Sequence, residues 1–338
     1  MLFFVTTAGS CFSIKKKQIT PTLLDVSNAS HQELLDKINH FAKVDSMRAK
    51  MDLQLEDNSY AKIGQSEKYR NADGEVVVQR PANILLKIKV PVIKTEVAQM
   101  TSDGEKFQVA ILQDGSGGKY KKFVTGTNSE DYSLLQERVV ELAKGESADL
   151  KKNVNAFANI RPHHFTDAML VRPVDEAKYL YTKSTVIREE VDFKQKKKSP
   201  LYWVLRGYYL LDEFRKDDDG STKILRRFWF DRVGGARLAR QQIFDKNGEI
   251  ESDIVYGRVG ALSEQAGYTL PLLVEVTRPK EKYKMTLKYQ APKTVSIGKK
   301  YKAAAFVLKN RWNLEELDLD KKLSDVKNGK NQNSVLEQ

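Results

Sequence analysis

The sequence predicts a mainly β protein of the α+β class, in which a curled antiparallel sheet has its open side covered by a few helices. About a dozen segments alternate apolar and polar residues with a period of two, which is typical of strands that bury one face. Turn dipeptides, among them Asp103-Gly104 and Asn247-Gly248, separate many of these segments and favour hairpins. Three other segments have helical spacing, one before the first strand and two near the middle of the chain.

The first folded element expected is a helix over residues 32–43. Ser30 and Glu33 have the spacing of a capping box, which marks the start of a helix. The period then changes to two over residues 46–57, "SMRAKMDLQLED", where methionine, alanine and leucine alternate with charged and polar residues. This segment is predicted to be the first long strand, with one apolar face.

The remaining strands are expected to form a meander, because no repeat of βαβ type is present. They are predicted over 74–80, 83–92, 95–102, 105–112, 119–127, 184–193, 201–214, 223–232, 237–245, 250–259, 270–279 and 282–290. Helices are predicted over 131–145 and 161–170, between the two series of strands. A long sheet with one apolar face must close into a barrel, form a sandwich or be covered by other elements. Helices on the open side of a curled sheet would cover that face within a single domain, which is expected over residues 30–312. A polar, disordered tail is expected over 313–338.

Charge and cysteine content limit the classes of partner and site. The net charge of +12 over 338 residues favours an anionic partner, either a nucleic acid or a membrane surface. No run approaches the roughly 20 apolar residues of a membrane-spanning helix. The single cysteine excludes an internal disulfide and a cysteine-rich zinc site.

That single cysteine, Cys11, follows an apolar start and three small residues in "MLFFVTTAGSC". The pattern resembles a bacterial lipobox, in which the cysteine is lipidated and becomes the first mature residue, although Ala8 stands where leucine is usual. Residues 1–10 are then expected to be a signal-peptide remnant and 11–29 a polar tether to the membrane. Phe12 after the cysteine resembles the default for delivery to the outer membrane. The alternative is an ordinary buried cysteine near the chain end.

The order of helix, strands, helical insertion and further strands resembles the LolA/LolB superfamily of lipoprotein carriers. So do the segments "QRPANILLKI", "TSDGEKFQVAIL" and "FWFDRVGGARLARQQIFDKNGEI", and the resemblance covers roughly residues 32–310. It implies an incomplete β-barrel lined with apolar side chains and closed by a helical lid, which shelters the acyl chains of lipoproteins. Two features depart from the family: LolA-like segments are combined with an apparent anchor, and the segment around 133–144 looks like an insertion.

The resemblance and the strand pattern together predict an apolar groove for acyl chains. We name its expected lining the predicted groove residues: Met47, Met51, Leu53, Leu86, Ile88, Phe107, Val109 and Met285. The lid is expected to present Phe165, Ala168 and Met169. Methionine suits a ligand without fixed shape because its side chain adapts, but each of these residues could equally fill a core.

Other constellations give weaker signals. His163 and His164 are adjacent on a helix and therefore point about 100° apart, so they are not expected to share a metal ion. The aspartates of 217–219 are expected to form a solvated turn, and "DGSGGK" lacks the spacing of a P-loop. No catalytic residue, cofactor or metal is therefore predicted. The basic segments "KQKKKS" at 194–199 and Arg226-Arg227 are expected to be a solvated loop or a membrane-facing patch, with no nucleic-acid partner.

The sequence therefore predicts a monomeric, non-enzymatic lipoprotein of the bacterial envelope, anchored in the outer membrane through Cys11 and facing the periplasm, that binds acyl chains of lipoproteins or lipids. The alternative is a structural or interaction lipoprotein of the same fold with a filled core. A third hypothesis is a hydrolase whose dispersed catalytic residues form no motif.

Overall fold

The structure is a computed structural model that describes residues 20–57, 67–68, 71–90, 94–113, 121–130, 132, 134–135, 162–261 and 269–328. Cys11 lies outside the described residues, as do most of the predicted helix at 131–145 and the "DGSGGK" loop at 114–119.

Alternating side chains produce strands along most of the chain, as the sequence predicts. The described strands are β1 (Thr22–Leu23), β2 (Ser46–Asp57), β3 (Glu67–Lys68), β4 (Ala72–Gln79), β5 (Asn83–Lys89), β6 (Glu96–Ser102), β7 (Lys106–Ile111), β8 (Lys122–Thr127), β9 (Leu180–Val191), β10 (Trp203–Lys216), β11 (Thr222–Asp231), β12 (Arg237–Phe244), β13 (Ile250–Ala261), β14 (Thr269–Arg278), β15 (Tyr283–Tyr289), β16 (Ser296–Ile297) and β17 (Glu315–Asp318). Four short strands, β1, β3, β16 and β17, are not predicted from the sequence because two to four residues are too few to show a period.

The described α-helices are α1 (His31–Ala42), α4 (Pro162–Met169) and α5 (Leu319–Lys327), with 3₁₀ turns η2 (Pro292–Thr294) and η3 (Ala303–Phe306). The capping box at the start of α1 is confirmed, because the Glu33 amide donates to the Ser30 hydroxyl and the Ser30 amide donates to the Glu33 carboxylate. The helix predicted at 161–170 is confirmed as α4.

The described strands form one mixed sheet that does not close into a barrel. Successive neighbours lie in the order β9, β10, β11, β12, β13, β14, β15, β2, β4, β5, β6, β7, β8 and β17. These pairs are antiparallel except for β17 with β8, and β1 is parallel to β10. The prediction of a curled sheet is therefore confirmed, with two parallel pairs added to an antiparallel meander.

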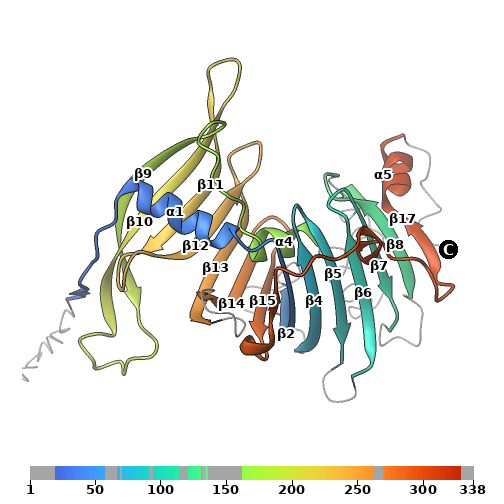
Figure 1. The fold of residues 1–338 in the computed structure, drawn as a ribbon, viewed down its shortest axis with the longest axis horizontal. Coiled ribbons are helices and arrows are strands. Elements are labelled where there is room, and N and C mark those ends of the chain that lie inside the picture. The colour runs from blue at the N-terminus through green and yellow to red at the C-terminus, as the bar shows by residue number, and fades with distance from the viewer. Residues whose placement is uncertain are drawn as a thin grey trace, which may run out of the picture.

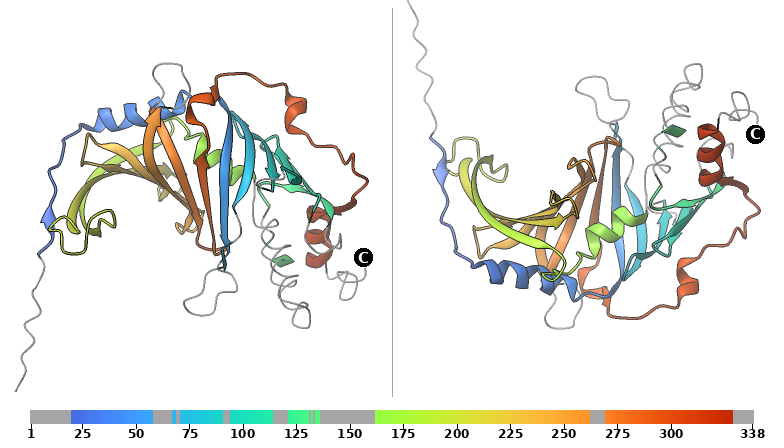
Figure 2. Two further views of the ribbon diagram at one scale, coloured as in Figure 1. Left: turned by 90° about the horizontal axis from the view of Figure 1, so that it is seen from below. Right: turned by 90° about the horizontal axis from the view of Figure 1, so that it is seen from above.

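The first long strand joins the two halves of the meander. β2 pairs on one side with β4, its near neighbour in sequence, and on the other side with β15, more than 200 residues away. Figure 1 shows β2 in the middle of the sheet, and Figure 2 shows the strands sweeping through an arc from β9 to β17. The apolar residues of both halves thereby become continuous on one face.

The helices α1 and α4 cover that face. In Figure 1, α1 crosses in front of β10 to β12, and α4 lies in front of β15 and β2. Leu34, Leu35 and Ile38 of α1 and Phe165 of α4 belong to the same buried cluster as the inward side chains of the strands. Burying this continuous surface provides the main hydrophobic stabilisation of the fold.

Two terminal segments differ from the prediction. The tail expected to be disordered from residue 313 contains β17 and α5, because Leu323 packs into the core and Asp318 caps the helix by accepting from the Lys321 amide. Of the segment 11–29 expected to be a polar tether, the described residues 20–29 include β1, which pairs with β10, and Ala29, which is buried.

Candidate functional site: an apolar face beneath a short helix

The centre of the apolar face comes from β2 and β15. Period-two alternation turns Met47, Met51 and Leu53 of β2 inward, and β15 places Met285 and Leu287 beside them. Leu287 lies directly opposite Leu53 across the antiparallel pair. All five are buried, so two halves of the chain far apart in sequence build one apolar surface.

A glycine allows one of these side chains to lie flat. Gly74 of β4 lies next to Leu53, and a Cβ atom added there would come within 2.7 Å of Leu53 Cδ1. The Leu53 side chain therefore occupies the space above the glycine, which smooths the surface between β2 and β4.

The face continues across β4 to β7 in a cross-strand row. Val76 lies opposite Leu86, Leu86 opposite Met100, and Met100 opposite Val109. Such opposed apolar pairs stabilise the sheet and extend one apolar strip across it. Phe107 is buried on the same face of β7.

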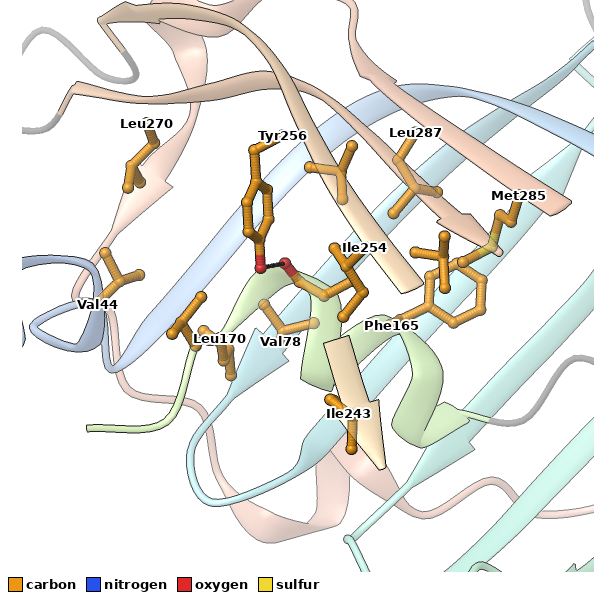
Figure 3. Packing of buried hydrophobic residues seen from close by; sticks show 14 of the residues in the cluster. Val44, Val78, Phe165, Leu170, Ile243, Ile254, Tyr256, Leu270, Met285 and Leu287 are labelled. Atoms are coloured by element: carbon orange, nitrogen blue, oxygen red, sulfur yellow. Dashed lines mark hydrogen bonds between the residues drawn. The ribbon is translucent and has the colours of Figure 1, made fainter. Parts of the chain in front are cut away.

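The short helix α4 packs on this strip. It contacts β4, β5, β6 and β14 and buries Phe165 and Ala168 against them, whereas Met169 is partly buried. Figure 3 shows Phe165 beside Met285, with Ile254 and Val78 nearby. The Tyr256 hydroxyl donates to the Ala168 carbonyl at 3.4 Å (Figure 3), and burial raises the pKa of Tyr256 far above its ordinary value.

Two arginines hold the segment that follows α4. Arg80 donates from Nη2 to the Val171 carbonyl at 2.7 Å and from Nε to the Val44 carbonyl, just after α1, at 3.1 Å. Arg226 donates from Nη1 to the Arg172 carbonyl at 3.0 Å. The C-terminal end of α4 is therefore fixed to the sheet and to the end of α1.

Polar groups also lie under α4. The ring of His164 is hydrogen-bonded through Nδ1 to the Tyr283 hydroxyl, and both side chains are buried. Burial raises the pKa of the Asp167 carboxyl, and the nearby Arg172 opposes that rise. The hydroxyl–imidazole contact is the kind of pair that the hydrolase hypothesis needs, but neither of the two cavities described below includes either residue in its lining.

Two cavities occur on the opposite face of the sheet. One, of about 200 Å³, is lined by Arg48, Glu75, Val77, Leu85, Lys87, Tyr301 and Ala305. The other, of about 390 Å³, contains Trp229 between the guanidinium groups of Arg188 and Arg240, 5.6 and 5.2 Å from the ring centre. Arg240 is already paired with Asp253. Charged side chains contribute to the lining of both cavities, and the lining of neither includes any of the predicted groove residues.

The structure brings all the predicted groove residues onto one face. Seven of the eight are 8% exposed or less, and Ile88 is partly buried against the same cluster. Helices α1 and α4 cover much of this face in this conformation, and Tyr132 packs edge-on against Phe107. Arg226, predicted as a surface residue, is buried on it and paired with Glu213, and Arg227 pairs with Asp212. The signal that was missed is the alternation of Arg226, Phe228 and Phe230, which places an arginine at an inward position.

No helix among the described residues has the length and apolarity to cross a membrane. No group of three or more histidine, cysteine, aspartate or glutamate side chains within the described ranges could hold a metal ion.

No family model matches the sequence. No curated protein matches it either. Among solved structures, the chain is similar to a LolA-superfamily protein from Nitrosomonas europaea, at 12% identity over 83% of this chain and 99% of that one, with a TM-score of 0.42. It is also similar to a DUF1329-family protein from Desulfovibrio piger, at 10% identity over 81% and 94% of the chains with a TM-score of 0.40. An outer membrane lipoprotein-sorting protein domain from Vibrio parahaemolyticus matches at 10% identity over 80% and 95%, with a TM-score of 0.39. These are distant likenesses of fold and no more.

Proposed function

We propose that this protein is an envelope protein that binds acyl chains of lipoproteins or lipids between the curled sheet and α4. The observation that carries the proposal is the continuous apolar face, built from both halves of the meander and covered at its centre by a helix of only eight residues. Binding needs no covalent step. In this proposal the protein is a monomer, and lipidation of Cys11 anchors it to the outer membrane on the periplasmic side.

An acyl ligand places an energetic demand on the face that binds it. Hiding a 16-carbon chain from water is worth on the order of 12 kcal/mol, at ~0.8 kcal/mol for each methylene. A carrier therefore has to offer a wide apolar surface, and methionines such as Met47, Met51 and Met285 can adapt to a chain without fixed shape.

Entry of a chain requires α4 to move, because the predicted groove residues are buried in this conformation. Arg80 and Arg226 fix the C-terminal end of the segment. We therefore place the pivot after Met169, with Phe165 leaving the strip so that the acyl chain takes its place.

The alternative function follows from the same burial. If α1 and α4 stay in place, the apolar face is an ordinary core, and the protein serves as a structural or interaction component of the envelope. The two functions differ in one measurable property, which is the uptake of an acyl chain.

The test compares two phenylalanines in the full chain carrying Cys11→Ser. Phe165 lies under α4, and Phe306 is equally buried but packs on the opposite face, outside the cluster of the apolar face. Phe165→Ala should open space on the strip and change the affinity for a fluorescent fatty acid several-fold, whereas Phe306→Ala should change only stability.

Native mass spectrometry of the Cys11→Ser protein from a bacterial periplasm, followed by organic extraction, would identify a bound lipid. A clean apo mass together with no uptake of the fatty acid by any of the three proteins would reject acyl binding and leave the alternative function.

A further inference from the structure

The hairpin between β9 and β10 ends in a tip, residues 192–202, with an unusual surface. Phe193 is 85% exposed and Leu201 is 42% exposed. Lys194 and the lysines of 196–198 are also exposed, and none of the four forms an ion pair within the described residues. With Asp192 as the only acid, the tip carries a net charge of +3.

The tip is held in a defined conformation. The Gln195 amide donates to the Asp192 carbonyl at 2.9 Å, the Ser199 amide to the Lys196 carbonyl at 2.7 Å, and the Tyr202 amide to the Ser199 carbonyl at 3.1 Å. These turns present Phe193 and Leu201 to solvent. Tyr202 and Trp203 form an edge-on aromatic pair at the base of the tip, with ring centres 5.9 Å apart.

This combination fits a lipid surface better than another anionic partner. Unpaired lysines are attracted to anionic headgroups, and tyrosine and tryptophan prefer the boundary between headgroups and acyl chains. Moving an exposed phenylalanine side chain out of water into an apolar environment lowers the free energy. A nucleic-acid backbone does not provide such an environment. The lysines of the tip therefore lie beside exposed apolar side chains, which a purely electrostatic binding site would lack.

The N-terminal segment leads to the same place. The Thr22 hydroxyl donates to the Pro200 carbonyl at 2.8 Å, and β1 is parallel to β10, so the chain before Thr22 points toward the tip. Figures 1 and 2 show the first described residues beside this hairpin. Eight residues lie between Cys11 and Thr20, so the nine steps from one Cα atom to the next span at most about 32 Å when extended.

We infer that the β9–β10 tip is a membrane-docking surface that binds anionic phospholipid, with its lysines on the headgroups and Phe193 and Leu201 in the boundary region. The tip lies away from α4, so docking does not depend on acyl-chain binding beneath that helix. Where Cys11 is lipidated, the tip holds the body of the protein in one orientation on the membrane.

The experiment uses the full chain with Cys11→Ser, so that no anchor contributes. Sedimentation with vesicles of phosphatidylglycerol and phosphatidylethanolamine, and with vesicles of phosphatidylcholine alone, gives the partition coefficients. The tip variant replaces the four lysines 194, 196, 197 and 198 with glutamine. A matched variant replaces four exposed lysines of another segment, Lys293, Lys299, Lys300 and Lys302, so that both lose the same charge.

The tip variant should bind anionic vesicles at least about tenfold more weakly, while the matched variant stays within about twofold of the parent. Phe193→Ser should weaken binding several-fold, and Val307→Ser, at another exposed apolar residue, should not. In Phe193→Trp, the tryptophan emission should shift to the blue on anionic vesicles and be quenched by brominated acyl chains.

Equal losses in the two four-lysine variants would overturn the inference, since binding would then follow net charge alone. The protein could instead bind an anionic polymer while the emission of Phe193→Trp stays unshifted on vesicles. That result would identify an acidic macromolecule, and not a lipid surface, as the partner of the tip. Vesicle binding and fatty-acid uptake are separate measurements, so this inference and the proposed function can fail independently.

Discussion

Arg226 of β11 and Glu213 of β10 lie opposite each other in the sheet and form a buried ion pair. Arg226 Nε donates to Glu213 Oε1 at 2.8 Å, and both side chains are 2% exposed or less. Because Arg226 also donates to the Arg172 and Pro173 carbonyls, the pair ties the sheet to the segment that follows α4. A buried pair of this kind is costly to break from one side, because the remaining charge has no compensation.

Glu213→Gln should therefore lower the free energy of unfolding by about 3 kcal/mol or more. The matched control is Asp217→Asn, which removes the same charge from an exposed turn where Arg215 and Lys223 are the partners, and should cost far less stability than Glu213→Gln. Urea unfolding at neutral pH measures both. If the two variants lose the same free energy of unfolding within error, the buried ion pair contributes no more to stability than the exposed one.

Tyr181 should make stability sensitive to alkaline pH. Its hydroxyl donates to Glu213 Oε2 at 2.6 Å, and burial together with this carboxylate raises the pKa of Tyr181 to about 12. The folded state favours the neutral phenol, so this contribution is complete below the ordinary pKa of 10 and is lost as the pH rises from 10 toward 12. Stability should fall more steeply over that range in the parent than in Tyr181→Phe, and parallel curves would contradict the assignment.

Asp320 should control the attachment of α5 at acidic pH. Its carboxylate accepts from the hydroxyls of Thr127, at 2.8 Å, and Tyr132. Burial opposes ionisation, but these hydrogen bonds prevail and lower the pKa of Asp320. The contribution is present above the ordinary pKa of about 3.9 and is lost as the pH falls through the lower folded-state value.

Hydrogen exchange of the α5 amides measures this local effect apart from the other carboxylates. Exchange between pH 5 and 3, corrected for its intrinsic pH dependence, should accelerate in the parent and change little in Asp320→Asn, which should be less protected at pH 5. If amide exchange accelerates equally in both proteins, a group other than Asp320 causes the loss of protection at acidic pH.

Local pattern was enough to predict the longer strands, the start of α1 and the residues that share the apolar face. Met47, Met51 and Leu53 follow a strict alternation, so the face they occupy is determined before any partner is known. The pairing of β2 with β15 could not be read from the sequence, because it joins segments more than 200 residues apart without a turn between them. Whether the face is open or covered depends on that pairing and on α4.

The buried arginine shows why composition misled at one position. An Arg-Arg dipeptide normally indicates a charged surface, yet only Arg227 has the partly exposed, paired environment expected of one. Arg226 is tolerated inside because Glu213 lies opposite and two carbonyls accept its remaining donors. Those partners lie on other segments, so no local pattern contains them.

Arg80 offers the sharpest test of α4 as a lid. It binds the Val171 and Val44 carbonyls at once, so Arg80→Gln should leave these acceptors without their donor and weaken the hold on the end of α4. Amide exchange over residues 164–171 should accelerate about tenfold, which corresponds to ~1.4 kcal/mol. The control is Arg240→Gln on the opposite face, where the guanidinium pairs with Asp253 and does not touch α4. If α4 gates acyl uptake, the fatty acid should also associate faster with Arg80→Gln than with the control.

Faster amide exchange without faster association of the fatty acid would mean that α4 opens but admits no ligand. The protein would then have the alternative function, that of a structural or interaction component of the envelope.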